Sequence, residues 1–405
     1  MRILILVDCY LPSTKSGAKL VHDLAVEFVC QEHEVIVAAP DNSITTPTQI
    51  TVEDGVTIFR VRTGKIKGAG KIVRAFNEMR LSSTVFRAGK NFFKSNQCDL
   101  IVLYAPTIFF ASLVKKLKKL WKCKCYLIQR DIFPKWALDA GIIKKGPVYW
   151  FFRRKELQHY NAVDIIAVES YGYLDYFSSL GLDKKKQIEV LYNWVTLKEK
   201  NVPVSNDRKK LGLENKIVFF YGGNIGVAQD MDNILRLAQN MRDLPEVYFL
   251  LVGQGSEVSR LKAKISKEKM TNISIHSAVP QEKYLGMLSQ FDVGLISLNK
   301  KLKSHNFPGK MLAYMYFSMP ILASINYGND LKQLIEESKS GLVSLNGEHD
   351  RFFAHAELLA KRSNIRLEMG NNARGLLEKT FNVTRAAAQI LSHEELYADK
   401  LKNNR

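Results

Sequence analysis

The sequence predicts an α/β protein made of two doubly wound parallel sheets. The chain has 405 residues, more than one typical hydrophobic core holds, so two domains of roughly 200 residues each are expected. Short runs rich in Val, Ile and Leu alternate with helical stretches along the whole chain. Such runs, without polar alternation, are typical of strands that are buried on both faces of a parallel sheet.

The strand-like runs fall into two groups of six. The first group is Ile3–Asp8, Val35–Ala39, Val56–Val61, Leu100–Tyr104, Cys125–Gln129 and Ile165–Val168. The second group is Ile217–Tyr221, Tyr248–Val252, Ile273–His276, Val293–Ser297, Ile321–Ala323 and Gly341–Ser344. A polar stretch from Pro203 to Asp207 lies between the groups and has the composition of a linker. We therefore expect one domain at 1–195, a second at 196–380, and a helix at 381–405 that could pack back across the domain junction.

The apolar runs and the cysteines indicate a cytosolic protein. The first run ends at Asp8 and is too short for a secretory signal peptide, and no stretch approaches the ~18 apolar residues of a membrane span. The five cysteines are odd in number, and those in apolar patterns are typical of reduced thiols.

The basic residues are concentrated in one segment of the first half. The formal net charge is +19, and 16 Lys or Arg stand against two acidic residues from Arg60 to Lys124. Within this segment, Lys71–Arg80 and Lys90–Lys94 have amphipathic helical patterns that suit docking on anionic lipid. A core-facing helix with a solvated basic side is the simpler interpretation. Nucleic acid is disfavoured as a partner, because the segment has no recognised RNA- or DNA-binding signature.

Ligands of doubly wound sheets bind beyond the carboxyl ends of the strands, and two such domains facing one another would form a cleft. Gly17 follows the first strand, and the loop Gly222–Asp230 follows the seventh; both open a helix and could let a phosphate approach the backbone. Neither has the G-x-G-x-x-G pattern, which disfavours a nicotinamide cofactor. Asp230 and Asp232 could bind a metal, but acids are favoured in a first helical turn anyway, so no metal is predicted.

Charged residues at two other strand–helix junctions have alternative interpretations. Lys310 lies in the first turn of a helix that follows the Pro308-Gly309 turn, where a cation opposes the helix dipole. A bound anion would relieve that conflict, whereas a solvated lysine would need no ligand. Asp131 ends a buried strand beside Arg130, and the two side chains could line a cleft or simply pair with each other.

Together these stretches resemble the retaining glycosyltransferases of family 4, which have the two-domain GT-B fold, over essentially the whole chain. The motifs that carry the resemblance are the N-terminal Pro…Gly loop, Arg130–Pro134, Gly223–Gly226, Val279-Pro280, Asp292–Leu295 and Pro308–Lys310. Within the family, Gly223–Gly226 and Asn306–Lys310 are most similar to those of bacterial O-antigen and capsule enzymes that transfer N-acetyl-L-fucosamine.

The resemblance implies a nucleotide-sugar site formed by the loops. The donor-binding residues would be Gly17, Gly223, Asn224, Gly226, Val279, Pro280, Pro308, Gly309 and Lys310. The catalytic candidates would be Asp131, His305 and Lys310, with Asp131 where many relatives carry a histidine that touches the donor sugar. The family's two glutamates, eight residues apart, are replaced here by His305 and Ala313, which removes the usual ribose contact.

The implied activity is that of a metal-independent hexosyltransferase that needs no cofactor. It would move N-acetyl-L-fucosamine from its UDP donor to a lipid-diphosphate-linked saccharide in O-antigen, lipopolysaccharide or capsule biosynthesis. The expected location is the cytoplasmic face of the inner membrane, with segment 60–124 as the peripheral membrane contact. The alternatives are a UDP-N-acetylhexosamine epimerase of GT-B fold and, in a different class, a basic nucleic-acid-binding protein.

Overall fold

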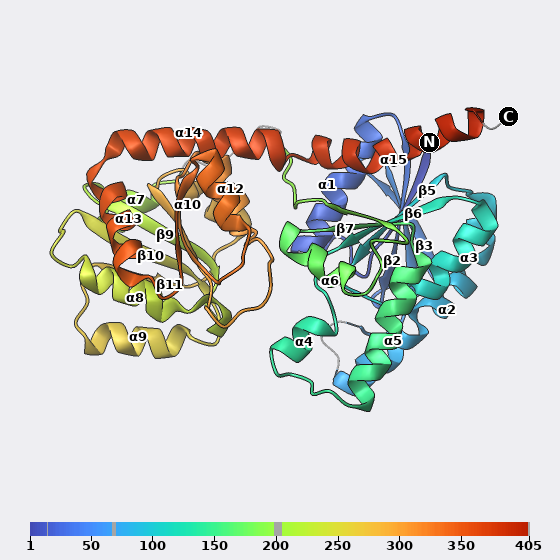
Figure 1. The fold of residues 1–405 in the computed structure, drawn as a ribbon, viewed down its shortest axis with the longest axis horizontal. Coiled ribbons are helices and arrows are strands. Elements are labelled where there is room, and N and C mark those ends of the chain that lie inside the picture. The colour runs from blue at the N-terminus through green and yellow to red at the C-terminus, as the bar shows by residue number, and fades with distance from the viewer. Residues whose placement is uncertain (14, 67–69, 198–204, 404–405) are drawn as a thin grey trace. The chain divides into compact units, whose positions relative to one another are not determined.

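The computed structural model describes residues 1–13, 15–66, 70–197 and 205–403, and the chain divides into two compact units (Figure 1). The first unit comprises Met1–Thr196 and Asn382–Arg405, and the second comprises Leu197–Phe381. Pro203 of the predicted linker lies outside the described residues. None of the helices in the described part of the chain is long and apolar enough to cross a membrane.

An eight-stranded sheet forms the centre of the first unit, in the order β3-β4-β2-β1-β5-β6-β7-β8. The strands are β1 (Arg2–Leu6), β2 (Glu34–Asp41), β3 (Thr48–Glu53), β4 (Val56–Arg62), β5 (Leu100–Ala105), β6 (Lys124–Gln129), β7 (Ile165–Val168) and β8 (Gln187–Val190). All neighbouring strands are parallel except β3 and β4. Because β1 lies between β2 and β5, the chain reverses its progress across the sheet there, which makes β1 and β5 the topological switch point.

Helices cover both faces of this sheet. They are α1 (Ser16–Cys30), α2 (Lys71–Ser95), α3 (Ala111–Trp121), α4 (Lys135–Asp139), α5 (Pro147–Ala162), the 3₁₀ turn η1 (Tyr171–Tyr173), α6 (Leu174–Ser178) and α15 (Val383–Asn403). Leu4 and Leu6 are buried with α2, α3 and α5, whereas Ile3 and Ile5 are buried with α1 and α15. The C-terminal helix α15 packs beside α1 in the first unit (Figure 1).

The second unit has a parallel six-stranded sheet in the order β11-β10-β9-β12-β13-β14. Its strands are β9 (Ile217–Asn224), β10 (Val247–Gln254), β11 (Ile273–His276), β12 (Val293–Ser297), β13 (Ile321–Ile325) and β14 (Gly341–Leu345). Its helices are α7 (Asp207–Lys210), η2 (Val227–Gln229), α8 (Met231–Asn240), α9 (Val258–Lys267), α10 (Gln281–Leu288), α11 (Lys310–Tyr316), α12 (Leu331–Ser338), α13 (His349–Lys361) and α14 (Ser363–Thr380). The switch point of this sheet lies between β9 and β12.

The predicted fold class is confirmed, and each of the twelve predicted strands corresponds to a strand of the structure. The sequence analysis misses β3 and β8, which are the two edge strands of the first sheet. β3 is mostly exposed and pairs with β4 through a turn at Asp54-Gly55, so it lacks an apolar run. β8 carries Gln187 and Glu189, so it has no continuous apolar run by which it could be recognised as a strand.

The basic segment also differs from expectation, because Lys71–Arg80 and Lys90–Lys94 belong to one continuous helix, α2. From Leu81 onward the helix contributes Leu81, Val85 and Phe93 to the core, and Phe86 and Phe92 pack against it while partly buried. That part of α2 fits the core-facing interpretation. In its first turns, Val73, Phe76 and Met79 are large apolar side chains that are exposed.

Candidate functional site

The candidate site of the second unit is built from the two loops at its switch point. One, here called the glycine loop, comprises the carboxyl end of β9 with Gly222 and Gly223 and the residues after it with Gly226; the other follows β12 and leads to Lys310. Loops on either side of a switch point diverge to opposite faces of the sheet, which leaves room for a ligand beyond the strand ends.

Close packing or backbone conformation requires glycine at three positions of this site, Gly222, Gly223 and Gly253. A Cβ atom at Gly222 would lie 2.3 Å from Cε2 of Tyr284, and the Gly222 amide donates a hydrogen bond to Tyr314 Oη at 3.1 Å. Gly223 has a φ of +123°, which L side chains rarely adopt. A Cβ atom at Gly253, in the neighbouring strand β10, would lie 1.8 Å from the Gly223 carbonyl oxygen. The sequence analysis misses Gly253, although the Gly253-Gln254-Gly255 pattern marks it.

Lys310 turns its amine onto this glycine loop. Its Nζ atom lies 3.4 Å from the ring centroid of Tyr221, a fully buried residue of β9, and 3.7 Å from the position of a Cβ atom at Gly223. Among the described residues, no carboxylate lies within ion-pair distance of this amine. Burial lowers the pKa of the Lys310 amine to about 7. The structure therefore places an amine without a counter-charge where burial disfavours its charged form.

The helix-dipole argument for Lys310 contributes little, because α11 is only seven residues long. Pro308 and Gly309 immediately precede it, and the Pro308 carbonyl accepts the Met311 amide at 2.9 Å. Gly309 has a φ of −57°, and a Cβ atom there would meet nothing within 4 Å. Neither backbone conformation nor packing thus requires glycine at position 309.

Hydrogen bonds to the side chain of Gln229 connect Asn224 and Gly226, beside the glycines described above. Gln229 Oε1 accepts the Gly226 amide at 3.1 Å and the Asn224 side-chain amide at 2.9 Å. The Gly226 N–H expected to face a phosphate is therefore occupied by Gln229 in this structure. A ligand would have to displace Gln229 to reach it.

His305 lies in the loop after β12. It is half-buried, and its Nδ1 atom donates a hydrogen bond to the Gly328 carbonyl at 2.9 Å. The same loop is held by Asn326, whose side chain donates to the carbonyls of Leu302 and Ser304 at 3.1 and 3.0 Å. Asn326 is fully buried and was not predicted from the sequence.

Val279 and Pro280 lie between β11 and α10, where Val279 is half-buried and Pro280 is exposed. The Pro280 carbonyl accepts the Tyr284 amide at 2.9 Å. Since the Tyr284 ring packs against Gly222, the start of α10 is connected to the glycine loop through this tyrosine.

The two acids considered as metal ligands have protein partners. Asp230 accepts a hydrogen bond from the side chain of Asn346 at 2.9 Å. Asp232 accepts from Arg260 at 2.6 Å and from Lys264 at 2.9 Å, and these hydrogen bonds lower the pKa of its carboxyl to about 2. Both carboxylates are thus used within the second unit.

In the first unit, Gly17 and Asp131 lie at the carboxyl ends of the strands. A Cβ atom at Gly17 would lie 3.2 Å from Cε1 of Tyr104, a buried residue near the end of β5. Asp131 is exposed, and its carbonyl accepts the Gln129 side chain at 2.7 Å. Arg130 does not pair with Asp131; it donates to the Leu191 carbonyl at 2.7 Å.

A buried acid also lies at this edge of the first sheet, and the sequence analysis misses it. Glu169 follows β7 and is only 3% exposed. It accepts a hydrogen bond from the Asn193 side chain at 2.6 Å. Its position directly after a predicted strand is the signal that could have identified it.

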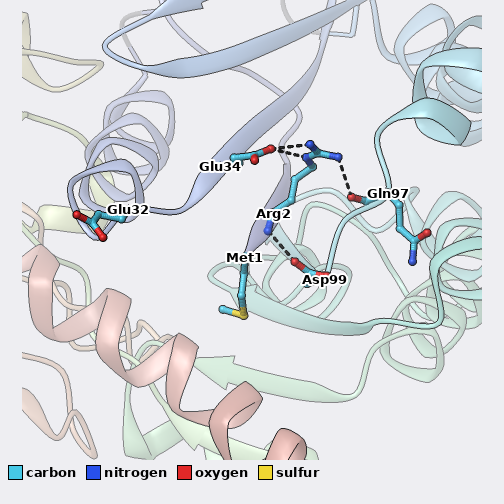
Figure 2. Close-up of a pocket in the computed structure, with 6 residues that line it drawn as sticks. All are labelled: Met1, Arg2, Glu32, Glu34, Gln97 and Asp99. Atoms are coloured by element: carbon cyan, nitrogen blue, oxygen red, sulfur yellow. Dashed lines mark hydrogen bonds and ion pairs between the residues drawn. The ribbon is translucent and has the colours of Figure 1, made fainter.

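A pocket of about 410 Å³ lies elsewhere in the first unit, at the amino end of β1 (Figure 2). Its arginine, Arg2, is paired with Glu34 at 2.6 Å, and the Arg2 amide donates to Asp99 at 2.7 Å. Because these polar groups satisfy one another and the carboxyl edge of the sheet lies at the other end of β1, this pocket is separate from the candidate site.

The fold is that of the two-domain glycosyltransferases. The chain superposes on sucrose-phosphate synthase from Thermosynechococcus elongatus with a TM-score of 0.70 and 14% identity, covering 98% of this chain and 99% of that one. It superposes on Anabaena Alr3699/HepE, in complex with UDP and glucose, with a TM-score of 0.66 and 14% identity, covering 98% and 99%.

Residues 203–376, in the second unit, match the family model of glycosyl transferases group 1. The probable glycosyltransferase WbjE of Pseudomonas aeruginosa is 25% identical over 223 residues, which are 54% of this chain and 55% of WbjE. The putative colanic acid biosynthesis glycosyl transferase WcaI of Escherichia coli K12 is 24% identical over 249 residues, which are 59% of this chain and 60% of WcaI. The matches thus span a little over half the length of these curated relatives.

Proposed function

We propose that this chain is a glycosyltransferase that moves a sugar from a UDP-linked donor to a lipid-diphosphate-linked saccharide during the assembly of a surface polysaccharide. The group 1 family match and two relatives that are named as glycosyltransferases support the reaction class. The name of WcaI, with its role in colanic acid biosynthesis, supports a polysaccharide as the product. The HepE complex with UDP supports UDP as the nucleotide.

The observation that carries this proposal is the unpaired amine of Lys310 against Tyr221 and the glycine loop. A donor diphosphate beside Nζ would supply the counter-charge that the described residues lack, and would raise the pKa of the amine again. When the bond from the sugar to the diphosphate breaks, its electron pair moves to the leaving phosphate oxygen. The ammonium is already in place to stabilise that charge, without a metal ion or other cofactor.

On the acceptor side, a hydroxyl oxygen of the saccharide forms the new bond to the sugar, and its proton goes to the departing diphosphate. His305 and Asp131 are proposed to contact the transferred sugar, with Gly17 near the diphosphate. The proposed sugar is N-acetyl-L-fucosamine, because the Asn306–Lys310 and Gly223–Gly226 motifs resemble those of transferases for that sugar.

A lipid-linked acceptor requires the enzyme to work at a membrane surface. We place it on the cytoplasmic face of the inner membrane, with the basic segment 60–124 as one contact. The exposed Val73, Phe76 and Met79 of α2 support this placement, since they are interspersed with Arg74 and Arg80.

Calorimetric titration with UDP, with GDP, dTDP and a short oligonucleotide as comparators, tests the proposal. Selective UDP binding that Lys310→Ala weakens is the expected result, and transfer to a polyprenyl-diphosphate saccharide is then assayed with UDP-sugars. Turnover of the donor without an acceptor would indicate the epimerase instead. Oligonucleotide binding without nucleoside diphosphate binding would overturn the proposal.

A further inference from the structure

The first unit exposes a cluster of apolar side chains outside the basic segment. Six large ones are exposed between α4 and the middle of α5, namely Trp136, Ile142, Val148, Trp150, Phe151 and Leu157. Three of them, Ile142, Val148 and Trp150, are 60% exposed. Two of the chain's four tryptophans are in this cluster, whereas the other two are buried.

The orientation of α5 explains why these side chains face outward. Its inner face is occupied by Glu156, His159 and Tyr160, which are fully buried against the sheet. Trp150 and Leu157 are seven residues apart and therefore lie on one side of the helix, away from these buried residues, where both are exposed. The exposed side of α5 thus carries Trp150 and Leu157 beside polar residues such as Arg154, whereas the exposed side of such a helix is ordinarily polar throughout.

Aromatic rings that are less exposed pack against part of this cluster. The Phe152 ring packs edge-on against Phe133, with ring centroids 4.9 Å apart, and against Phe109 at 6.4 Å. Phe133 in turn lies 6.2 Å from the exposed Trp136 of α4. These ring contacts connect Trp136 of α4 to Phe152 of α5 through Phe133. Figure 1 shows where the two helices lie in the first unit.

Basic residues are interspersed with these apolar residues along the sequence. Six Lys or Arg stand against two acids from Lys135 to Leu157. Both acids are already paired, Asp139 with Lys135 and Glu156 with Arg153, each at 2.5 Å. The exposed Lys144, Lys145 and Arg154 have no acidic partner in the described part of the chain.

We propose that this aromatic-basic surface, residues 136–157, inserts its apolar tips into an anionic lipid bilayer. Tryptophan and short apolar side chains favour the boundary between headgroups and acyl chains, and unpaired Lys and Arg favour anionic headgroups. The occupant is a bilayer rather than a protein groove because three of the six side chains are 60% exposed and the charged residues among them without an ion-pair partner are all basic. The inference deepens the proposed function, since a lipid-linked acceptor resides in such a bilayer.

Vesicle binding of the full chain tests the proposal. Vesicles of phosphatidylglycerol with phosphatidylethanolamine are compared with vesicles of phosphatidylcholine alone. In the variant Trp136→Phe, Trp150 is the one remaining exposed tryptophan, because Trp121 and Trp194 are 4% and 2% exposed. Its emission is expected to shift to the blue on the anionic vesicles and to be quenched by brominated acyl chains. An unshifted, unquenched emission in the bound state would overturn the proposal.

The double variant Trp150→Ser, Phe151→Ser is expected to lower the partition coefficient about tenfold or more, because two large apolar side chains no longer leave water. The matched control is Leu367→Ser in α14 of the second unit, where the side chain is 68% exposed and binding is expected to be unchanged. Lys144→Glu with Lys145→Glu is expected to remove the preference for the anionic vesicles.

UDP titration of each variant separates this inference from the proposed function. Weakened vesicle binding with unchanged UDP affinity supports the inference, whereas equal vesicle binding by the double variant contradicts it. If light scattering finds that the wild type self-associates, and that the double variant is monomeric with the same vesicle binding, the surface is an interface between copies and the proposal is wrong.

Discussion

The Nζ atom of Lys310 lies 3.4 Å from the ring centroid of Tyr221, and the pair joins the start of α11 to the end of β9. The contact crosses the switch point of the second sheet. It also explains how a lysine amine without a carboxylate partner can be tolerated, because the electron-rich face of the ring attracts a cation. A ligand anion would complete the arrangement.

Replacing Lys310 by Ala should weaken UDP binding about tenfold to hundredfold, the value of one charge-assisted hydrogen bond of about 1.5–3 kcal/mol. Titration calorimetry measures the change. Lys267→Ala, on the exposed end of α9 in the same unit, is the matched control and should bind UDP normally. Wild-type affinity in Lys310→Ala would remove this residue from the site.

The pH dependence of UDP binding follows from the pKa of the Lys310 amine, about 7 in the free protein. Above that pH the amine must take up a proton to bind an anion. Affinity should therefore fall as pH rises from 7 to 9, by up to about tenfold per unit until the pKa of the complex is reached. The slope should disappear in Lys310→Ala; a slope that persists would assign the titration to another group.

Stability should change with pH in the opposite direction. Burial lowers the pKa of Lys310 from 10.5 to about 7, so between these values the unfolded chain binds more protons than the folded one. The contribution of this residue to stability thus rises with pH across that window and is least favourable below pH 7. Lys310→Met should accordingly raise the thermal midpoint at pH 7 while UDP binding is lost. A lower midpoint would show that the charged form is not destabilising.

Ala313 lies one helical turn after Lys310 on α11, so a carboxylate there would approach the amine. Ala313→Glu should keep Lys310 charged to higher pH and move the fall in UDP affinity upward by about one pH unit. Ala313→Gln has a similar size without the charge and should leave the profile in place. The comparison is made by calorimetry across the same pH range, and identical profiles for both variants would contradict the expectation.

Two glycines should respond differently to alanine. Gly309→Ala meets nothing within 4 Å, so thermal stability should be unchanged while UDP affinity falls if a phosphate approaches the backbone there. Gly253→Ala places a Cβ atom 1.8 Å from a backbone oxygen and should cost about 3 kcal/mol of stability. Gly375→Ala in α14, also with nothing within 4 Å, is the control for both. Normal UDP binding by Gly309→Ala would place the ligand elsewhere.

Glu189 should prove important for the attachment of α15. It accepts hydrogen bonds from the Tyr126 hydroxyl and from Gln389 Nε2 at 2.9 Å, and it pairs with His393 at 2.9 Å. Glu189→Ala leaves these partners unsatisfied and should cost about 2–4 kcal/mol. Amide hydrogen exchange in 383–393 should accelerate, and Glu268→Ala on the exposed surface should have no such effect. Unchanged exchange would mean that the apolar residues of α15 suffice.

Twelve strands could be predicted from local patterns because, apart from the edge strand β3, both sheets are parallel, and their central strands are buried on both faces. A run such as Leu100–Tyr104 has no polar face, and this marks it clearly in the sequence. The order of the strands within each sheet cannot be predicted from local patterns. That β9 lies between β10 and β12 depends on long-range pairing such as Phe219 with Val293, which no local pattern contains.

The candidate site, too, could be predicted only in part from the sequence. The chain's own residues identify Gly223, Gly309 and Lys310, because glycine beside a strand end and lysine at a helix start are unusual enough to be noticed. Only the folded chain brings Lys310 onto Tyr221, occupies the Gly226 amide with Gln229, and gives Gly253 its contact with Gly223. Local residue patterns decide which segments form strands, helices and loops, whereas the charge state of Lys310 and the accessibility of each amide depend on atoms from distant segments that meet only after folding.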